Sequence, residues 1–211
     1  MSKLFLTSSV SDVASHLATR VDFSNGRALV FITTPVEPKD EASDLSWLQA
    51  DRQSLVDNGF EVTNYTITGK NREQLLEELS SFNFIYISGG NTFYLLVKSQ
   101  ESGFDSVIQE LVNVQGKTYI GTSAGSIIAG PKCPDYLLEM EEVNKIQSSE
   151  GYGLVNFTIL PHWGSSTFKE KYLDKRLAIA YRDNQVPLIL LTDSQYISIE
   201  DGNMEIIETR T

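Results

Sequence analysis

The sequence predicts an α/β fold with three layers, in which helices cover both faces of a mostly parallel sheet. Short apolar segments alternate with helical patterns along most of the 211 residues. Two of these segments, Ala28–Thr33 and Phe84–Ser88, are continuously apolar, as expected for strands that are buried on both faces. At the C-terminal end, Tyr196–Glu200 and Met204–Glu208 flank an Asp-Gly-Asn turn, which is typical of a hairpin. The hairpin predicts an antiparallel edge to the sheet.

The N-terminal half supplies the first strands and helices of this pattern. We expect strands at Lys3–Thr7 and Glu61–Thr68, and helices at Val10–Val21 and Arg72–Leu79. Residues Pro35 to Asp40 are expected to form a loop that opens a long amphipathic helix, which ends at Asn58-Gly59. The inward face of that helix is predicted to consist of Leu45, Leu48, Leu55 and Val56.

The C-terminal half continues the alternation, with one irregular stretch. Helical patterns cover Thr92–Lys98 and Ser106–Val114, and an apolar run then enters Gly121. Residues from Pro131 to about Gly153 show no regular pattern. The remaining predicted elements are a strand at Leu154–Leu160, a helix at Phe168–Asp183 and a strand at Pro187–Leu191. No repeat, low-complexity tract or linker interrupts the chain, so we expect a single domain over residues 1–211.

Composition argues against several classes of function. The net charge is −11 and no block of Lys or Arg is present, so binding of nucleic acid through its phosphates is not expected. Cys133 is the only cysteine, which leaves no intrachain disulfide or cysteine metal cluster. The two histidines lie far apart in the sequence and no His-Glu-x-x-His is present, so no metal is expected. Neither a Gly-Lys-Ser/Thr P-loop nor a Rossmann glycine motif is present, so no other cofactor is expected. The N-terminal apolar stretch is too short for a signal peptide and no run reaches membrane-spanning length, which predicts a cytoplasmic protein.

Gly121-Thr122-Ser123-Ala124-Gly125 is the segment that points most directly to chemistry. A strand-like run precedes it and a helix-compatible run follows it, as in a nucleophile elbow, where a sharp turn exposes a serine hydroxyl. The alternative is a tight strand-to-helix turn without catalytic function.

A serine nucleophile needs a base, and the chain has two histidines. His16 lies in the early amphipathic helix, where a packing or surface role is favoured. His162 follows the Leu154–Leu160 strand at its carboxyl end, the edge of a parallel sheet where ligands bind, and is the preferred base. Two aspartates are candidates to orient the imidazole: Asp193, which follows the Pro187–Leu191 strand, and Asp135 in the irregular segment, ranked just behind it.

An oxyanion hole would require backbone donors near Ser123. The N–H of Ala124 is the natural first donor, and the second could come from Gly89-Gly90, at the end of a neighbouring strand. Asn91 and Thr92 follow directly and are candidate substrate-binding residues. The alternative for this segment is a strand end followed by a helix cap.

Three motifs in order, Ser88-Gly-Gly-Asn-Thr-Phe93, Gly121–Gly125 and Val155-Asn-Phe-Thr-Ile-Leu-Pro-His162, resemble the peptidase E family of serine dipeptidases, which includes cyanophycinase-related members. The resemblance extends over nearly the whole chain. It implies a fold like that of class I glutamine amidotransferases, with a flavodoxin-like sheet. It also implies Ser123 as nucleophile, His162 as base, and Gly90 and Ala124 as oxyanion donors.

The resemblance further implies cleavage of dipeptides that carry an N-terminal aspartate. In the family this preference is linked to an arginine on the segment after the catalytic histidine. Here Arg176, Lys169 and Lys171 are the candidates to pair with a substrate carboxylate, and the alternative for each is an ordinary solvated helix charge.

The leading hypothesis is therefore a serine peptidase that acts on short peptides through an acyl-enzyme. An esterase or other amide hydrolase with the same machinery is the alternative among enzymes. A non-catalytic protein that binds a small ligand is the alternative outside them. Sheet edges and apolar helix faces are compatible with a homodimer.

Overall fold

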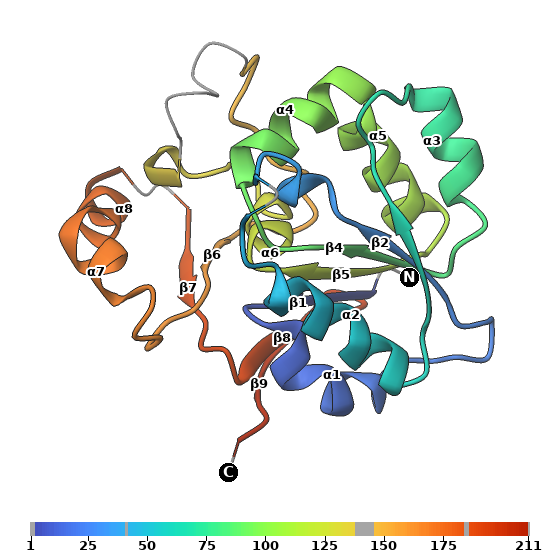
Figure 1. The fold of residues 1–211 in the computed structure, drawn as a ribbon, viewed down its shortest axis with the longest axis horizontal. Helices are drawn as coiled ribbons and strands as arrows, with labels where there is room; N and C mark the ends of the chain where they lie inside the picture. The colour runs from blue at the N-terminus through green and yellow to red at the C-terminus, as the bar shows by residue number, and fades with distance from the viewer. Residues whose placement is uncertain (1–2, 41, 138–145, 184–185, 211) are drawn as a thin grey trace.

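The central feature of the computed structural model, which describes residues 3–40, 42–137, 146–183 and 186–210, is a seven-stranded sheet in the order β3-β2-β4-β5-β1-β8-β9 (Figure 1). The five strands from β3 to β1 are parallel, β8 is antiparallel to β1, and β9 is antiparallel to β8. The predicted parallel sheet and C-terminal hairpin are thus confirmed. The strands of this sheet are β1 (Lys3–Thr7), β2 (Ala28–Ile32), β3 (Glu61–Tyr65), β4 (Phe84–Ile87), β5 (Thr118–Thr122), β8 (Gln195–Glu200) and β9 (Asn203–Glu208).

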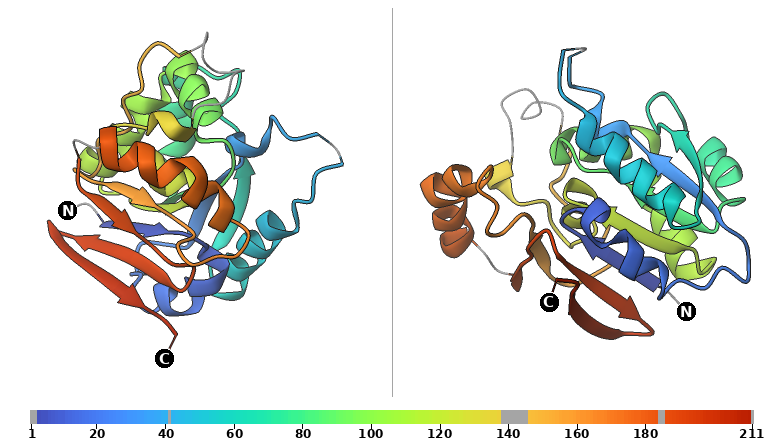
Figure 2. Two further views of the ribbon diagram at one scale, coloured as in Figure 1. Left: turned by 90° about the vertical axis from the view of Figure 1, so that its left-hand side faces the viewer. Right: turned by 60° about the horizontal axis from the view of Figure 1, so that its bottom comes forward.

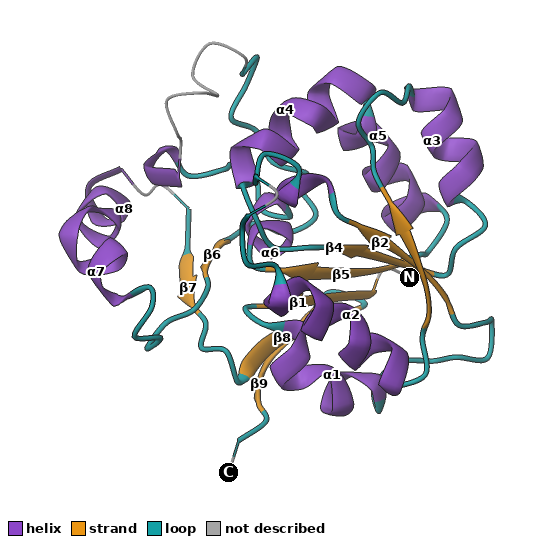
Figure 3. Cartoon of the chain, viewed as in Figure 1, coloured by secondary structure: helices purple, strands orange, loops and turns teal. Residues whose placement is uncertain are grey.

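Helices cover both faces of the sheet, which gives the three predicted layers (Figure 3). Successive β1 side chains point to opposite faces: Phe5 packs with residues of α1 and α2, whereas Leu4 and Leu6 pack with residues of α3 to α6. The helices are α1 (Val10–Ala18), α2 (Ser46–Asp57), α3 (Arg72–Leu79), α4 (Thr92–Ser102), α5 (Phe104–Gln109), α6 (Ala124–Ile128), α7 (Lys169–Lys171) and α8 (Leu177–Asp183). No helix of the described ranges is long and apolar enough to cross a membrane.

Two late strands form a separate small sheet. β6 (Thr158–Leu160) and β7 (Leu188–Leu190) pair in parallel with each other and do not join the seven-stranded sheet, because β8 already occupies the free edge of β1. Together with α7 and α8 they lie beside the main sheet, on the side away from α3 (Figures 1 and 2). β6 is also shorter than the predicted Leu154–Leu160, since the N–H groups of Leu154 and Val155 donate to the carbonyl of Ala129 and not to a strand.

Several boundaries differ from the prediction for local reasons. The expected loop after β2 begins with a 3₁₀ turn at Thr34–Val36 that contains Pro35. Val56, predicted on the inward face of α2, is 38% exposed. The helix predicted over Phe168–Asp183 is divided by a π-helical segment at Tyr172–Arg176. These differences lie outside the strand ends that carry the candidate site.

Candidate active site

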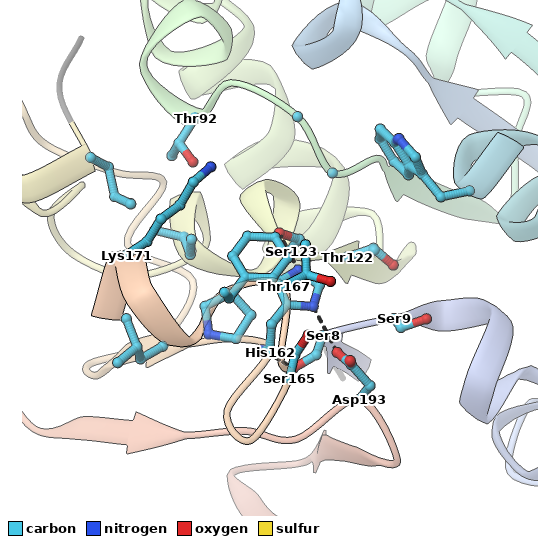
Figure 4. Close-up of a pocket in the computed structure, with 18 of the residues that line it drawn as sticks. Ser8, Ser9, Thr92, Thr122, Ser123, His162, Ser165, Thr167, Lys171 and Asp193 are labelled. Atoms are coloured by element: carbon cyan, nitrogen blue, oxygen red, sulfur yellow. Dashed lines mark hydrogen bonds and ion pairs between the residues drawn. The ribbon is translucent and has the colours of Figure 1, made fainter. Parts of the chain in front are cut away.

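Ser123 occupies a strained turn between β5 and α6, as a nucleophile elbow requires. Its φ of 49° and ψ of −105° are rare for a residue with a side chain, and such a conformation costs about 1–3 kcal/mol. The Ser123 N–H donates to the carbonyl of Thr7 at 3.0 Å, and the Ser123 carbonyl accepts from Ser126 and Ile127, each at 3.0 Å. These contacts fix the backbone and leave the Oγ pointing into the cleft (Figure 4).

The two glycines of the elbow are required by close packing. A Cβ at Gly125 would lie 2.2 Å from the carbonyl oxygen of Ile87, and one at Gly121 would lie 2.7 Å from the backbone of Gly125. Both distances are shorter than van der Waals contact allows, so α6 can lie against β4 and β5 only when both positions are glycine. The predicted glycine spacing therefore has a direct steric reason.

His162 connects Ser123 to an aspartate (Figure 4). Its Nε2 lies 3.0 Å from Ser123 Oγ and its Nδ1 lies 2.7 Å from Asp193 Oδ1. His162 also has a positive φ, 61°. Its N–H donates to Ser8 Oγ at 3.1 Å, and the Ser8 hydroxyl donates in turn to the carbonyl of Leu191 at 2.8 Å. Ser8, the residue after β1, thus connects the segment that follows β6 with the segment that follows β7.

Aromatic packing against the face of the ring also fixes the imidazole of His162. The ring of Phe168 stacks on His162 with 4.3 Å between centroids and an interplanar angle of 11°. Tyr172 follows in the same stack, 6.0 Å from Phe168, and its hydroxyl donates to the carbonyl of Pro161. Because the two aromatic residues hold both the ring and the backbone before it, the orientation of His162 is set before a substrate binds.

The geometry favours Asp193 over Asp135 as the candidate acid. Both ring nitrogens of His162 have partners, Ser123 on one side and Asp193 on the other. Asp135 lies instead in an exposed 3₁₀ turn, 3.4 Å from Lys132. Asp193 therefore stays the preferred acid, and its role remains a prediction.

Two backbone N–H groups remain the candidates for an oxyanion hole, that of Gly90, whose neighbour Gly89 packs beside Ser123, and that of Ala124, the residue after Ser123. Gly90 has a φ of +133° and is packed so tightly that a Cβ there would lie 2.4 Å from the carbonyl oxygen of Pro35. Ala124 is the first residue of α6. Within the described part of the chain, no acceptor binds the N–H of either residue, which leaves both donors available to a ligand.

The site opens into a cleft with a volume of about 650 Å³. Asn91 and Thr92 line it at the start of α4, and the Asn91 side chain also caps that helix by accepting from the N–H of Tyr94 at 2.9 Å. The helix cap anticipated as the alternative for this segment is therefore present, and substrate binding by Asn91 and Thr92 stays a prediction. Arg176 also lines the cleft, with its guanidinium over the ring of Tyr172.

Three polar or aromatic residues of the cleft, Lys39, Trp47 and Asp51, had no predicted role, whereas Lys171 was named with Arg176 and Lys169 as a candidate to pair with a substrate carboxylate. Lys39 and Trp47 lie together, the ammonium 5.1 Å from the indole ring, and the indole borders Gly89 beside Ser123. Lys171 lines the cleft near Phe168. Lys39, Lys171 and Arg176 thus place three cations around the cleft of a chain with a net charge of −11. No motif marks Lys39 or Trp47, because only the tertiary fold brings them to the cleft.

The third missed residue, Asp51, is a buried carboxylate in the cleft wall. It lies on α2, is 3% exposed, and accepts from the hydroxyl of Tyr86 at 2.9 Å and from the N–H of Ser11 at 3.3 Å. Burial raises the pKa of Asp51 to about 6, and the hydrogen bonds from Tyr86 and Ser11 offset only part of that effect. Asp51 therefore carries its charge at neutral pH at the expense of fold stability.

Replacing Asp51 with asparagine is expected to raise the free energy of unfolding at pH 8 by up to about 3 kcal/mol. The folded state binds the Asp51 proton more tightly than the unfolded state, so the wild type gains stability as the pH falls through about 6. The free energy of unfolding of Asp51→Asn lacks this pH dependence. The variant should therefore be no more stable than the wild type by about pH 4. Thermal unfolding followed by circular dichroism across this range tests it. A stability difference between variant and wild type that does not change with pH would contradict the expectation. Asp57→Asn, which removes an exposed carboxylate from the same helix, serves as the control.

Within the described residues, no group of three His, Cys, Asp or Glu side chains is placed to hold a metal ion. The arrangement of Ser123, His162 and Asp193 is instead that of a nucleophile, a base and an orienting carboxylate.

Comparison with known proteins agrees with this geometry. The family model for peptidase family S51 matches residues 4–207. An uncharacterized peptidase of Listeria monocytogenes is 32% identical over 173 residues, which cover 81% of this chain and 82% of the relative. A Drosophila melanogaster protein named as a probable alpha-aspartyl dipeptidase is 31% identical over 153 residues, 71% of this chain and 61% of that protein.

The fold has a solved counterpart. A crystal structure of a Listeria monocytogenes protein, described as a candidate peptidase E, superimposes with a TM-score of 0.85 at 26% identity, covering 99% of this chain and 98% of the other. The likeness to the peptidase E family inferred from three motifs is confirmed by these matches. The chain is a serine peptidase and belongs to peptidase family S51.

Proposed function

We propose that this peptidase hydrolyses short peptides, dipeptides with an N-terminal aspartate above all, through an acyl-enzyme formed on Ser123. The observation that carries the proposal is the pair of hydrogen bonds from Ser123 through His162 to Asp193, at 3.0 and 2.7 Å. The cytoplasm is the proposed location, in line with a single cysteine, Cys133, that is buried and free.

In the proposed reaction, Ser123 Oγ attacks the scissile carbonyl while His162 Nε2 accepts its proton. Asp193 accepts a hydrogen bond from Nδ1–H and stabilises the imidazolium. The carbonyl oxygen becomes negative and accepts hydrogen bonds from the N–H groups of Gly90 and Ala124. His162 then gives the proton to the leaving amine, and water, deprotonated by the same imidazole, releases the acyl group.

The charge of the cleft supports an acidic substrate. An aspartyl dipeptide carries two carboxylates, and Arg176, Lys171 and Lys39 line the cleft on both sides of Ser123. Among these, Arg176 is proposed to pair with the aspartyl side chain, because a guanidinium can bind a carboxylate through two parallel hydrogen bonds. The name of the Drosophila relative points the same way.

A substrate panel tests the proposal. Asp-Leu should be cleaved with a higher kcat/KM than Leu-Leu or Lys-Leu, and Arg176→Ala should lower kcat/KM for Asp-Leu by about 10- to 100-fold. Hydrolysis of p-nitrophenyl acetate, which has no carboxylate, should change little. Arg182→Ala is the matched control, because Arg182 is exposed on the next helix and does not line the cleft.

Each alternative has a distinct outcome in the same panel. Ester hydrolysis without any peptide cleavage would indicate an esterase. Failure of a fluorophosphonate probe to label Ser123 in folded protein would indicate a binding protein. Equal cleavage of all three dipeptides would contradict the aspartyl preference alone.

A further inference from the structure

We propose that Asp51 binds the free α-ammonium group of the substrate and so makes the enzyme specific for peptides with an unblocked N-terminus. The inference rests on the proposed peptidase function and adds a specificity-determining residue to it. Asp51 is buried in the cleft wall, but no cation is recorded beside it among the described residues.

A buried carboxylate is stable when a cation accompanies it. Asp51 is 3% exposed and lines the cleft, yet its hydrogen-bond partners, Tyr86 and Ser11, are uncharged. The charged group that acts on it within the described residues is Asp12, another carboxylate. The protein therefore holds an anion at the cleft wall without supplying its counter-ion.

The two donors hold that anion in a fixed orientation. Ser11 belongs to the first turn of α1, where the helix N-terminus favours a negative charge. The Tyr86 ring is fully buried and stacks on Phe31, with 4.4 Å between centroids and an interplanar angle of 16°. A carboxylate that is fixed from two sides and borders the cleft is preorganised for a cationic ligand.

The position of Asp51 relative to the nucleophile fits an α-ammonium. Tyr86 binds Asp51 and also interacts with the side chain of Thr122, the residue before Ser123. In a peptide cleaved after its first residue, the α-nitrogen is two bonds from the scissile carbonyl carbon. A group that binds this nitrogen must therefore lie close to the nucleophile, and Asp51 is linked to the neighbouring residue through one tyrosine.

The proposal also accounts for the charges of the cleft as a set. An aspartyl dipeptide offers two carboxylates and one ammonium, and the cleft offers Lys39, Lys171 and Arg176 together with one buried carboxylate without a cation. An N-acylated peptide would leave Asp51 without its counter-ion on binding. It would be rejected for that reason.

The test compares substrates that differ only in the α-amine. Asp-Leu, N-acetyl-Asp-Leu and succinyl-Leu, which is Asp-Leu without the amine, are assayed with the wild type, Asp51→Asn and Asp57→Asn. Asp51→Asn should lower kcat/KM for Asp-Leu by at least about 100-fold, should leave kcat/KM for succinyl-Leu within about threefold, and should not change the rate of fluorophosphonate labelling. Asp57→Asn, which removes an exposed carboxylate from the same helix, should match the wild type on all three compounds. Equal losses of Asp51→Asn on Asp-Leu and succinyl-Leu, or no loss on either, would overturn the proposal.

A binding measurement keeps this result separate from the proposed reaction. In the Ser123→Ala background, calorimetry should find that Asp-Leu binds more tightly than succinyl-Leu, and that adding Asp51→Asn removes the difference. That result supports the role of Asp51 even if the wild type cleaves neither compound, in which case only the proposed reaction fails. Equal affinities before Asp51 is changed would contradict the proposal directly.

Discussion

Ser123→Ala should lower kcat for peptide hydrolysis by about 10⁴- to 10⁶-fold, the loss expected when a serine nucleophile is removed from a Ser-His-Asp arrangement. The hydroxyl 3.0 Å from His162 Nε2 is the group proposed to form the acyl-enzyme, and alanine offers no nucleophilic atom in its place. Initial rates on Asp-Leu, with fluorophosphonate labelling in parallel, measure the effect.

A second variant at the same position separates chemistry from folding. Alanine keeps a Cβ at a φ of 49°, so Ser123→Ala should melt close to the wild type. Ser123→Gly loses the hydroxyl equally but relaxes the turn, and it should be more stable by about 1 kcal/mol. Residual peptide cleavage by both variants at more than about a hundredth of the wild-type rate would rule out Ser123 as the nucleophile.

Asp193→Asn should lower kcat by about 10⁴-fold with little change in KM. The carboxylate 2.7 Å from His162 Nδ1 accepts a hydrogen bond and thereby keeps Nε2 free to take the serine proton. The amide of asparagine can donate to Nδ1 instead, which places the ring proton on Nε2, where it faces Ser123. The imidazole then cannot act as a base.

Asp135→Asn is the matched control for this prediction. It removes the same charge from an exposed turn that pairs with Lys132, so activity should stay within about twofold of the wild type. The reverse pattern, with Asp135→Asn inactive and Asp193→Asn active, would contradict the assignment of the acid.

The elbow and the histidine could be predicted from sequence because each depends on local order. Glycines two residues on either side of Ser123 mark the strand-to-helix turn, and a Cβ at Gly125 would lie 2.2 Å from the carbonyl oxygen of Ile87, too close for any side chain. His162 could be chosen because only one other histidine was available and because it followed a strand.

The acid could be ranked but not decided from sequence. Asp193 and Asp135 both follow plausible elements, and the pairing of β6 with β7 brings Asp193, three residues after β7, to the imidazole. That pairing could not be predicted from the sequence, because a three-residue strand in a separate sheet has the same apolar pattern as a strand of the main sheet.

The cleft walls were the least predictable part of the site. Asp51 lies in a predicted amphipathic helix, where a carboxylate is ordinarily solvated, and its burial depends on contacts with Ser11 and Tyr86. Lys39 and Trp47 come from a loop and a helix start with no recognisable motif. Their roles follow from tertiary contacts that single-sequence patterns do not encode.

The Ser8 hydroxyl has a consequence for how the enzyme acquires activity. It joins the end of the first strand to His162 and Leu191, residues 154 and 183 positions further along the chain. Contacts of such long sequence separation form late, since closing large loops costs entropy before any packing compensates for it. The distance between nucleophile and base is therefore set only when both ends of the polypeptide have assembled. A refolding chain should regain its secondary structure before its peptidase activity. A nascent chain that lacks the C-terminal segments should have no peptidase activity.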